Sequence, residues 1–122
     1  MKENVNKNRN TFNLVCYIKK ARTLKNGEAP VYMRITINKQ TADLSIQGSV
    51  NPNVWSQAKE QSRGKEKADY ELNHYIKSVK GKLIQIHREL ELSEKPINPQ
   101  IIKEIYLGAK MDNEDSKSLI EV

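Results

Sequence analysis

Residues 11–49 alternate between apolar and polar side chains with a period of two, and this pattern constrains the fold more than any other feature of the chain. Within it, the segments TFNLVCYIK, VYMRITIN and TADLSIQG each bring apolar side chains to one face. Alternation of this kind is typical of β-strands that bury one face and expose the other. The sequence therefore predicts a three-stranded antiparallel sheet over residues 11–49, with an apolar inner face and a polar outer face.

The pairing of the second and third strands follows from the turn between them. If Asn38 and Lys39 form a two-residue hairpin loop, three apolar pairs fall on the inner side, and polar residues face polar residues on the outer side. A shift by one residue would oppose apolar and polar side chains throughout. The predicted inner pairs are Ile37–Gln40, Ile35–Ala42, Met33–Leu44 and Val31–Ile46, and the outer pairs are Thr36–Thr41, Arg34–Asp43 and Tyr32–Ser45.

A small sheet needs a cover for its apolar face, and the second half of the chain supplies one. Apolar residues recur at every third or fourth position over residues 65–92, which predicts a long amphipathic helix. Residues 50–64 are expected to form a polar loop with a turn at Trp55. The predicted fold class is α+β: a three-stranded antiparallel β-sheet backed by a long α-helix, followed by a short helix and a disordered tail.

The short helix is expected over residues 97–108. Asn98 is a suitable N-cap and Pro99 suits the first helical position. An isolated helix of about ten residues is marginal in water, so its apolar stripe over residues 101–106 is expected to need a partner outside this chain. Residues 1–10 are predicted to be a disordered arm and residues 109–122 a flexible tail.

The positive charge of the chain is concentrated in its first half. Residues 1–50 carry nine basic and three acidic side chains, which accounts for the whole net charge of +6. A basic half-chain attracts a polyanion, and nucleic acid is the usual one. No apolar run is long enough to cross a bilayer, so no membrane partner is expected.

Residues suited to catalysis or metal binding are scarce. The single cysteine, Cys16, excludes a disulfide framework and lies within the apolar alternation, so a buried thiol is expected. His74 and His87 do not have the spacing of a metal site and are expected on the helix surface. The five glycines are scattered and form no phosphate-binding loop. The sequence therefore predicts no enzyme, no cofactor, no metal and no small-molecule substrate.

The outer face of the predicted sheet is the candidate binding surface. It gathers hydroxyl, amide, phenol and guanidinium groups, which are the types that read base edges in a major groove. Basic side chains at the strand ends and turns would meet phosphates. The alternative reading of Arg34 is a simple cross-strand ion pair with Asp43. Candidate base readers are Tyr17, Tyr32, Arg34, Thr36, Ser45 and Gln47, and candidate phosphate contacts are Lys19, Lys20, Arg22, Lys25 and Lys39.

These segments resemble a known family. NGEAPVYMRITINKQ, SIQGSVNPNVW and SRGKEK are similar to the N-terminal arm-type DNA-binding domain of tyrosine recombinases, with the integrases of Bacteroides-type conjugative transposons and prophages as the nearest group. INPQIIKEIYLG resembles the first helix of a SAM-like core-binding domain in the same proteins. The resemblance divides the chain into an arm-type domain over residues 11–92 and a truncated core-binding domain that begins at residues 97–108.

The resemblance implies a function. Such domains insert a three-stranded sheet into the major groove of double-stranded DNA at arm-type sites, as part of an integrase used in DNA integration and recombination. It also implies a bacterial, nucleoid-associated protein of the cytoplasm and self-association of recombinase protomers. The tyrosine recombinase catalytic constellation does not appear in this chain, so no strand cleavage is expected from it.

A second hypothesis comes from another functional class. The long helix and the apolar stripe over residues 101–106 could instead dock a protein partner, with the sheet as a scaffold. Salt distinguishes the two readings, because DNA binding weakens steeply as salt rises and apolar docking does not.

Overall fold

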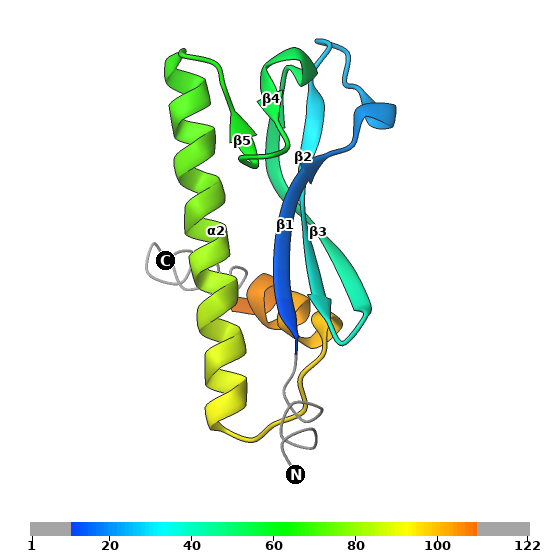
Figure 1. The fold of residues 1–122 in the computed structure, drawn as a ribbon, viewed down its shortest axis with the longest axis vertical. Helices are drawn as coiled ribbons and strands as arrows, with labels where there is room; N and C mark the ends of the chain where they lie inside the picture. The colour runs from blue at the N-terminus through cyan, green and yellow to red at the C-terminus, as the bar shows by residue number, and fades with distance from the viewer. Residues whose placement is uncertain (1–10, 110–122) are drawn as a thin grey trace, which may run out of the picture.

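The computed structural model describes residues 11–109 as a sheet covered on one face by helices (Figure 1). The three main strands are β1 (Phe12–Ile18), β2 (Ala29–Ile37) and β3 (Gln40–Val50), all antiparallel in the order β1-β2-β3. The helix α2 (Lys67–Leu92) runs alongside the sheet. This confirms the predicted fold class. The predicted arm over residues 1–10 and the predicted tail from residue 110 onward lie outside the described residues.

The β2–β3 hairpin has the predicted register from its turn to Tyr32. Arg34 lies opposite Asp43 and Tyr32 lies opposite Ser45. Asn38 and Lys39 have φ values of 49° and 71°, as a type I′ turn requires.

Beyond Tyr32 the predicted register is wrong. Pro30 lies opposite Ser49, so β3 contains extra residues and the expected Val31–Ile46 pair is not formed. Gln47 lies within this bulge with a positive φ of 55°. A bulge bends its strand and increases the local twist, and here it lets β3 continue to Val50.

The segment expected to be a polar loop contains a second, small sheet. The strands β4 (Trp55–Ser56) and β5 (Gln61–Ser62) pair antiparallel after the short 3-10 helix η2 (Pro52–Val54). Another 3-10 helix, η1 (Lys20–Arg22), lies in the connection between β1 and β2. Elements this short carry no periodic signal, so the alternation and helical patterns could not indicate them.

The β4–β5 hairpin protects the edge of β1. The Cys16 amide donates to Glu60 Oε1 at 2.8 Å, and Gln57 Nε2 donates to the Cys16 carbonyl at 2.9 Å. Trp55 Nε1 donates to Gln57 Oε1, and Lys80 Nζ lies 2.9 Å from Glu60 Oε1. An edge strand with unpaired amides and carbonyls is prone to pairing with another chain. Glu60 and Gln57 bind the backbone amide and carbonyl of Cys16, so these two groups are no longer available for such pairing.

The N-terminus of α2 is capped by its own residues. The Glu66 side chain accepts from the backbone of Asp69, and the Asp69 carboxylate accepts from the Glu66 amide at 3.0 Å. This reciprocal capping box fixes the start of the helix at Lys67, two residues after the predicted start. The Gly64 backbone packs so closely on the Asp69 carboxylate that a side chain there would displace it.

The apolar core lies between the inner face of the sheet and the helices. Met33 and Ile35 from β2 and Leu83 from α2 are fully buried in it. At about 25 cal/mol per Å² of apolar surface, side chains of this size each contribute roughly 1.5–3 kcal/mol when buried.

His87 contradicts the sequence prediction. Instead of lying on the surface, its ring is buried and stacks on Phe12, with centroids 4.0 Å apart and planes 3° apart. Its Nδ1 lies 3.7 Å from Glu91, and its buried Nε2 has no hydrogen-bond partner among the described residues. His74 is exposed as expected. The ring of His87 acts as an aromatic core residue that fixes the start of β1 against α2.

The C-terminal helix packs on this chain, contrary to the expectation that it would need an outside partner. It covers residues 99–109 of the described range, so within the predicted segment 97–108 it begins at Pro99, the predicted first helical position. Asn98 caps it, because its Oδ1 accepts from the Ile101 amide at 2.9 Å. Gly108 lies within the helix. The helix lies near the end of the sheet that carries the β2–β3 turn (Figure 1).

Two residues anchor the C-terminal helix in the core. Ile102 is completely buried and Tyr106 nearly so. Burial, together with the neighbouring Tyr75 of α2, raises the pKa of the Tyr106 phenol to about 12. The helix is therefore part of the same core as the sheet.

Cys16 is expected to resist alkylation in the native protein. Its side chain is fully buried, and burial raises the pKa of the thiol to about 12, so the reactive thiolate is nearly absent at neutral pH. Iodoacetamide labelling followed by mass spectrometry should show slow modification in buffer and rapid modification in denaturant. Fast labelling in buffer would contradict this packing of β1.

Candidate nucleic-acid interface

The outer face of the sheet consists of three rows of side chains, each running across the strands. The first row contains Tyr17, Tyr32 and Ser45; the second contains Val15, Arg34 and Asp43; the third contains Asn13, Thr36 and Thr41. This face lies away from the core and from α2, and five of the six predicted base readers belong to these rows. The sixth, Gln47, is exposed in the bulge of β3, one step beyond Ser45.

Arg34 lies at the centre of this face and is held by Asp43. Its Nε donates to Asp43 Oδ1 at 2.9 Å and its Nη2 donates to Asp43 Oδ2 at 3.1 Å. The Tyr17 hydroxyl donates to Asp43 Oδ2 at 2.7 Å, and the guanidinium lies 5.0 Å from the Tyr17 ring centroid. The cross-strand ion pair is therefore formed, as the alternative reading of Arg34 expected.

Arg34, Asp43 and Tyr17 shift one another's pKa values. The hydrogen bond from Arg34 lowers the pKa of the Asp43 carboxyl, and Asp43 in turn raises the pKa of Arg34. Partial burial and the Asp43 carboxylate raise the pKa of the Tyr17 phenol. All three groups therefore keep their ordinary charge at neutral pH: Arg34 is a cation, Asp43 an anion and Tyr17 a neutral phenol.

The ion pair uses only one edge of the guanidinium. Arginine has five N–H donors in a planar fork. Asp43 accepts from Nε and Nη2, and Nη2 also donates to the Tyr17 hydroxyl at 3.5 Å. Nη1 makes no hydrogen bond or ion pair with another residue in the range 11–109. The Arg34 side chain is 47% exposed, so its free edge can reach a ligand while Asp43 fixes its orientation.

Positive charge lies at both ends of this face. Lys19 Nζ lies 3.9 Å above the Tyr32 ring, and Arg22 Nη1 lies 3.5 Å from the Tyr32 hydroxyl. Lys20 belongs to η1 and Lys25 to the exposed turn that follows it, so four cations gather in the β1–β2 connection. Lys39 lies at the opposite end, in the β2–β3 turn.

Asp43 belongs to the site, although it was not among the predicted site residues. The signal was available, because the predicted register already placed it opposite Arg34. Its role in orienting the arginine depends on the bidentate geometry and on the Tyr17 hydroxyl, which alternation alone does not reveal.

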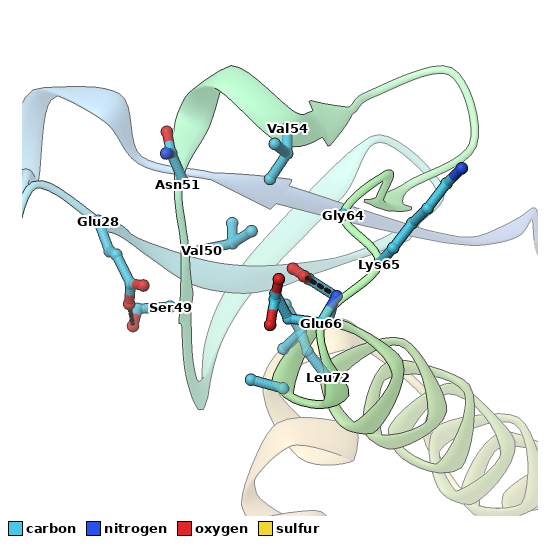
Figure 2. Close-up of a pocket in the computed structure, with 11 residues that line it drawn as sticks. Glu28, Ser49, Val50, Asn51, Val54, Gly64, Lys65, Glu66 and Leu72 are labelled. Atoms are coloured by element: carbon cyan, nitrogen blue, oxygen red, sulfur yellow. Dashed lines mark hydrogen bonds between the residues drawn. The ribbon is translucent and has the colours of Figure 1, made fainter.

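A groove at the start of α2 is a poor site for a polyanion (Figure 2). It has a volume of about 430 Å³, and the carboxylates of Glu28, Glu66 and Asp69 line it with a single cation, Lys65. These carboxylates already have partners: Ser49 donates to Glu28, and the other two form the capping box. The groove therefore belongs to the helix cap rather than to a nucleic-acid site.

Two further properties hold for the described residues. Residues 11–109 contain no cluster of three His, Cys, Asp or Glu side chains that could hold a metal ion. No helix in this range is long and apolar enough to span a membrane.

Comparison with known proteins identifies the domain. A family model described as an arm DNA-binding domain matches residues 16–103, which is more than two thirds of the 122-residue chain. The match extends from β1 through the sheet and α2 into the C-terminal helix. Comparisons with curated proteins and with solved structures gave no match. Domains of this kind bind DNA and are not themselves catalytic. The chain therefore belongs to the family of arm DNA-binding domains.

Proposed function

We propose that the chain binds double-stranded DNA by inserting the outer face of its sheet into the major groove at arm-type sites, as the N-terminal part of a site-specific integrase. The observation that carries this proposal is the arrangement around Arg34. An exposed guanidinium with one free edge, oriented by Asp43, lies in the middle of a polar face with cations at both ends.

The dimensions of the sheet support this mode of binding. Neighbouring strands lie about 4.8 Å apart, so the backbones of three strands span roughly 10 Å. The major groove is about 12 Å wide and admits a β-ribbon, whereas the minor groove is only about 6 Å wide. The outer face therefore fits the major groove better than the minor groove.

The proposed interface combines contacts to base edges with contacts to phosphates. The free edge of Arg34 suits the O6 and N7 acceptors of guanine, the most common specific contact of arginine in the major groove. Tyr17, Tyr32, Thr36, Ser45 and Gln47 offer further donors and acceptors for base edges. The cations of the β1–β2 connection and Lys39 would contact phosphates, which fix the register of the protein on the duplex.

The protein-docking hypothesis receives less support. It relies on the long helix and on the apolar stripe over residues 101–106, but Ile102 and Tyr106 of this stripe are buried in the core of the same chain. Ile105 is 39% exposed, which is an ordinary value for a single surface residue. Self-association of protomers stays a prediction.

Selection of duplexes from a randomised pool, followed by fluorescence-anisotropy titration, tests the proposed function. The selected duplex should bind more tightly than a scrambled duplex, and both should weaken as salt rises from about 50 mM to about 200 mM. Equal affinity for both duplexes would mean a basic surface without base reading. Salt-insensitive binding, or none, would contradict the proposal.

Replacing Arg34 by Ala should separate base reading from phosphate binding. We expect a loss of about 1–3 kcal/mol on the selected duplex and little change on the scrambled one. Lys25→Ala is the control, because loss of a phosphate contact should weaken both duplexes alike and lower the salt slope by about 1. Equal losses on both duplexes for Arg34→Ala would show that Arg34 does not read a base.

Replacing Asp43 by Asn tests whether the carboxylate positions Arg34. The variant removes a negative charge from the binding face, so affinity for the scrambled duplex should rise slightly. Affinity for the selected duplex should fall, because Arg34 then has to be ordered on binding. An increase of equal size for both duplexes would contradict the positioning role.

A further inference from the structure

The face of α2 that points away from the sheet contains a long stretch without acidic side chains. Residues 72–88 include four cations and no Asp or Glu. Lys80 is already paired with Glu60. Lys77, Lys82 and Arg88 are exposed and form no hydrogen bond or ion pair with another residue of the described chain. Among residues 11–109, no carboxylate therefore compensates the positive charge that this part of the helix presents.

The exposed cations of α2 lie on both sides of a stripe of small and uncharged polar residues. His74, Ser78, Gly81 and Gln85 follow each other at helical spacing along the exposed face. Lys77 and Arg88 lie on one side of this stripe and Lys82 on the other, over a length of about 16 Å at 1.5 Å per residue.

At Gly81, in the middle of the stripe, no side chain covers the helix backbone. A Cβ added at this position would meet nothing within 4 Å, so no packing contact requires the glycine. Glycine within a helix is destabilising by about 1 kcal/mol relative to alanine. Its position lets an extended backbone approach the helix closely between the cations.

We propose that this surface, formed by His74, Lys77, Ser78, Gly81, Lys82, Gln85 and Arg88, binds the phosphate backbone of a second DNA duplex without reading its sequence. Because α2 covers the inner face of the sheet (Figure 1), its exposed face and the outer face of the sheet point in opposite directions. One straight duplex cannot contact both. A single domain would thus hold two duplexes, one on each side.

Double-stranded DNA fits this surface better than an unpaired strand does. The stripe has no Phe, Tyr or Trp on which unpaired bases could stack. Carboxylates limit it at both ends: Glu71 lies 4.0 Å from Lys67, and Glu89 accepts a hydrogen bond from Gln85. Three phosphate contacts correspond to a salt slope of about 3 and to weak, non-specific affinity.

Sedimentation velocity of the full chain with a short dye-labelled duplex tests this proposal at low salt. The wild-type chain should form a complex of one chain with two duplexes. Lys77→Gln/Lys82→Gln/Arg88→Gln should bind one duplex only and leave the affinity of the tighter site unchanged. Lys65→Gln/Lys67→Gln/Lys95→Gln removes the same charge elsewhere and should still bind two.

This proposal rests on the proposed function only in taking the outer face of the sheet as the first DNA site. The possible outcomes distinguish failure of one proposal from failure of the other. Binding of a single duplex that depends on the sheet cations would overturn the second site and leave the first intact. Two duplexes held by two chains, or retained by the variant with three substitutions in α2, would also overturn it. Absence of any duplex binding would overturn both proposals.

Discussion

Replacing Lys19, Lys20, Arg22 and Lys25 together by Gln is expected to weaken binding to any duplex by roughly 10³-fold at about 0.1 M salt. Each phosphate that a cation neutralises contributes about 0.9 to the salt slope, so four contacts contribute about 3.6. The four side chains occupy one connection beside the outer face of the sheet, and Lys19 and Arg22 both contact Tyr32. Anisotropy titrations over a range of salt concentrations measure the affinity and the slope together.

The matched control removes the same number of charges elsewhere. Lys65, Lys67, Lys95 and Lys103 lie outside the sheet, and their replacement by Gln gives the same net charge. This control should lose far less affinity, because long-range attraction between exposed charges is largely screened beyond about 10 Å at this salt concentration. Equal losses for the two variants would mean that net charge, and not the face of the sheet, determines binding.

Ile102→Ala is expected to lower the free energy of unfolding by about 2–5 kcal/mol. Ile102 belongs to the C-terminal helix, yet its side chain is 0% exposed and lies in the same core cluster as the strands of the sheet. Truncation would leave a cavity lined by core residues of the arm domain. Urea denaturation followed by circular dichroism measures the change.

The neighbouring Ile105 provides the control for that measurement. It lies on the same helix and is 39% exposed, so Ile105→Ala should change stability by much less. A change below about 0.5 kcal/mol for Ile102→Ala would contradict the common core. The helix would then belong with a following domain, as the resemblance to a core-binding domain predicted.

The sheet could be predicted in detail because its determinants are local. Alternation fixed the inner and outer faces, and the Asn38-Lys39 turn fixed which residues pair. The bulge at Gln47 interrupts this register beyond Tyr32, where alternation predicts a regular ladder. Whether a strand of this length contains extra residues depends on packing, which the alternation alone does not encode.

The elements that were missed depend on contacts distant in sequence. The β4–β5 hairpin is held to β1 through Glu60 and Cys16, which are 44 residues apart. The C-terminal helix was predicted, but its packing on the core of this chain through Ile102 was not. The position of His87 on the apolar face could have been read from its helical spacing relative to Leu83 and Leu90. Its polarity and charged neighbours favoured the surface reading instead.

In the candidate site too, some features were predictable from the local sequence pattern and others were not. Alternation predicted which side chains share the outer face, and composition predicted the sign of its charge. The orientation of Arg34 by Asp43 and Tyr17 is a matter of side-chain geometry. It turns the arginine from a flexible cation into a donor with one defined free edge.

Methylation interference on a selected duplex tests most directly whether the sheet enters the major groove. Dimethyl sulfate modifies guanine N7, which lies in the major groove, and adenine N3, which lies in the minor groove. Methylation of at least one guanine N7 within the site should abolish binding, and methylation of adenine N3 in the same region should not. Interference from adenine N3 alone would contradict major-groove binding by the outer face of the sheet.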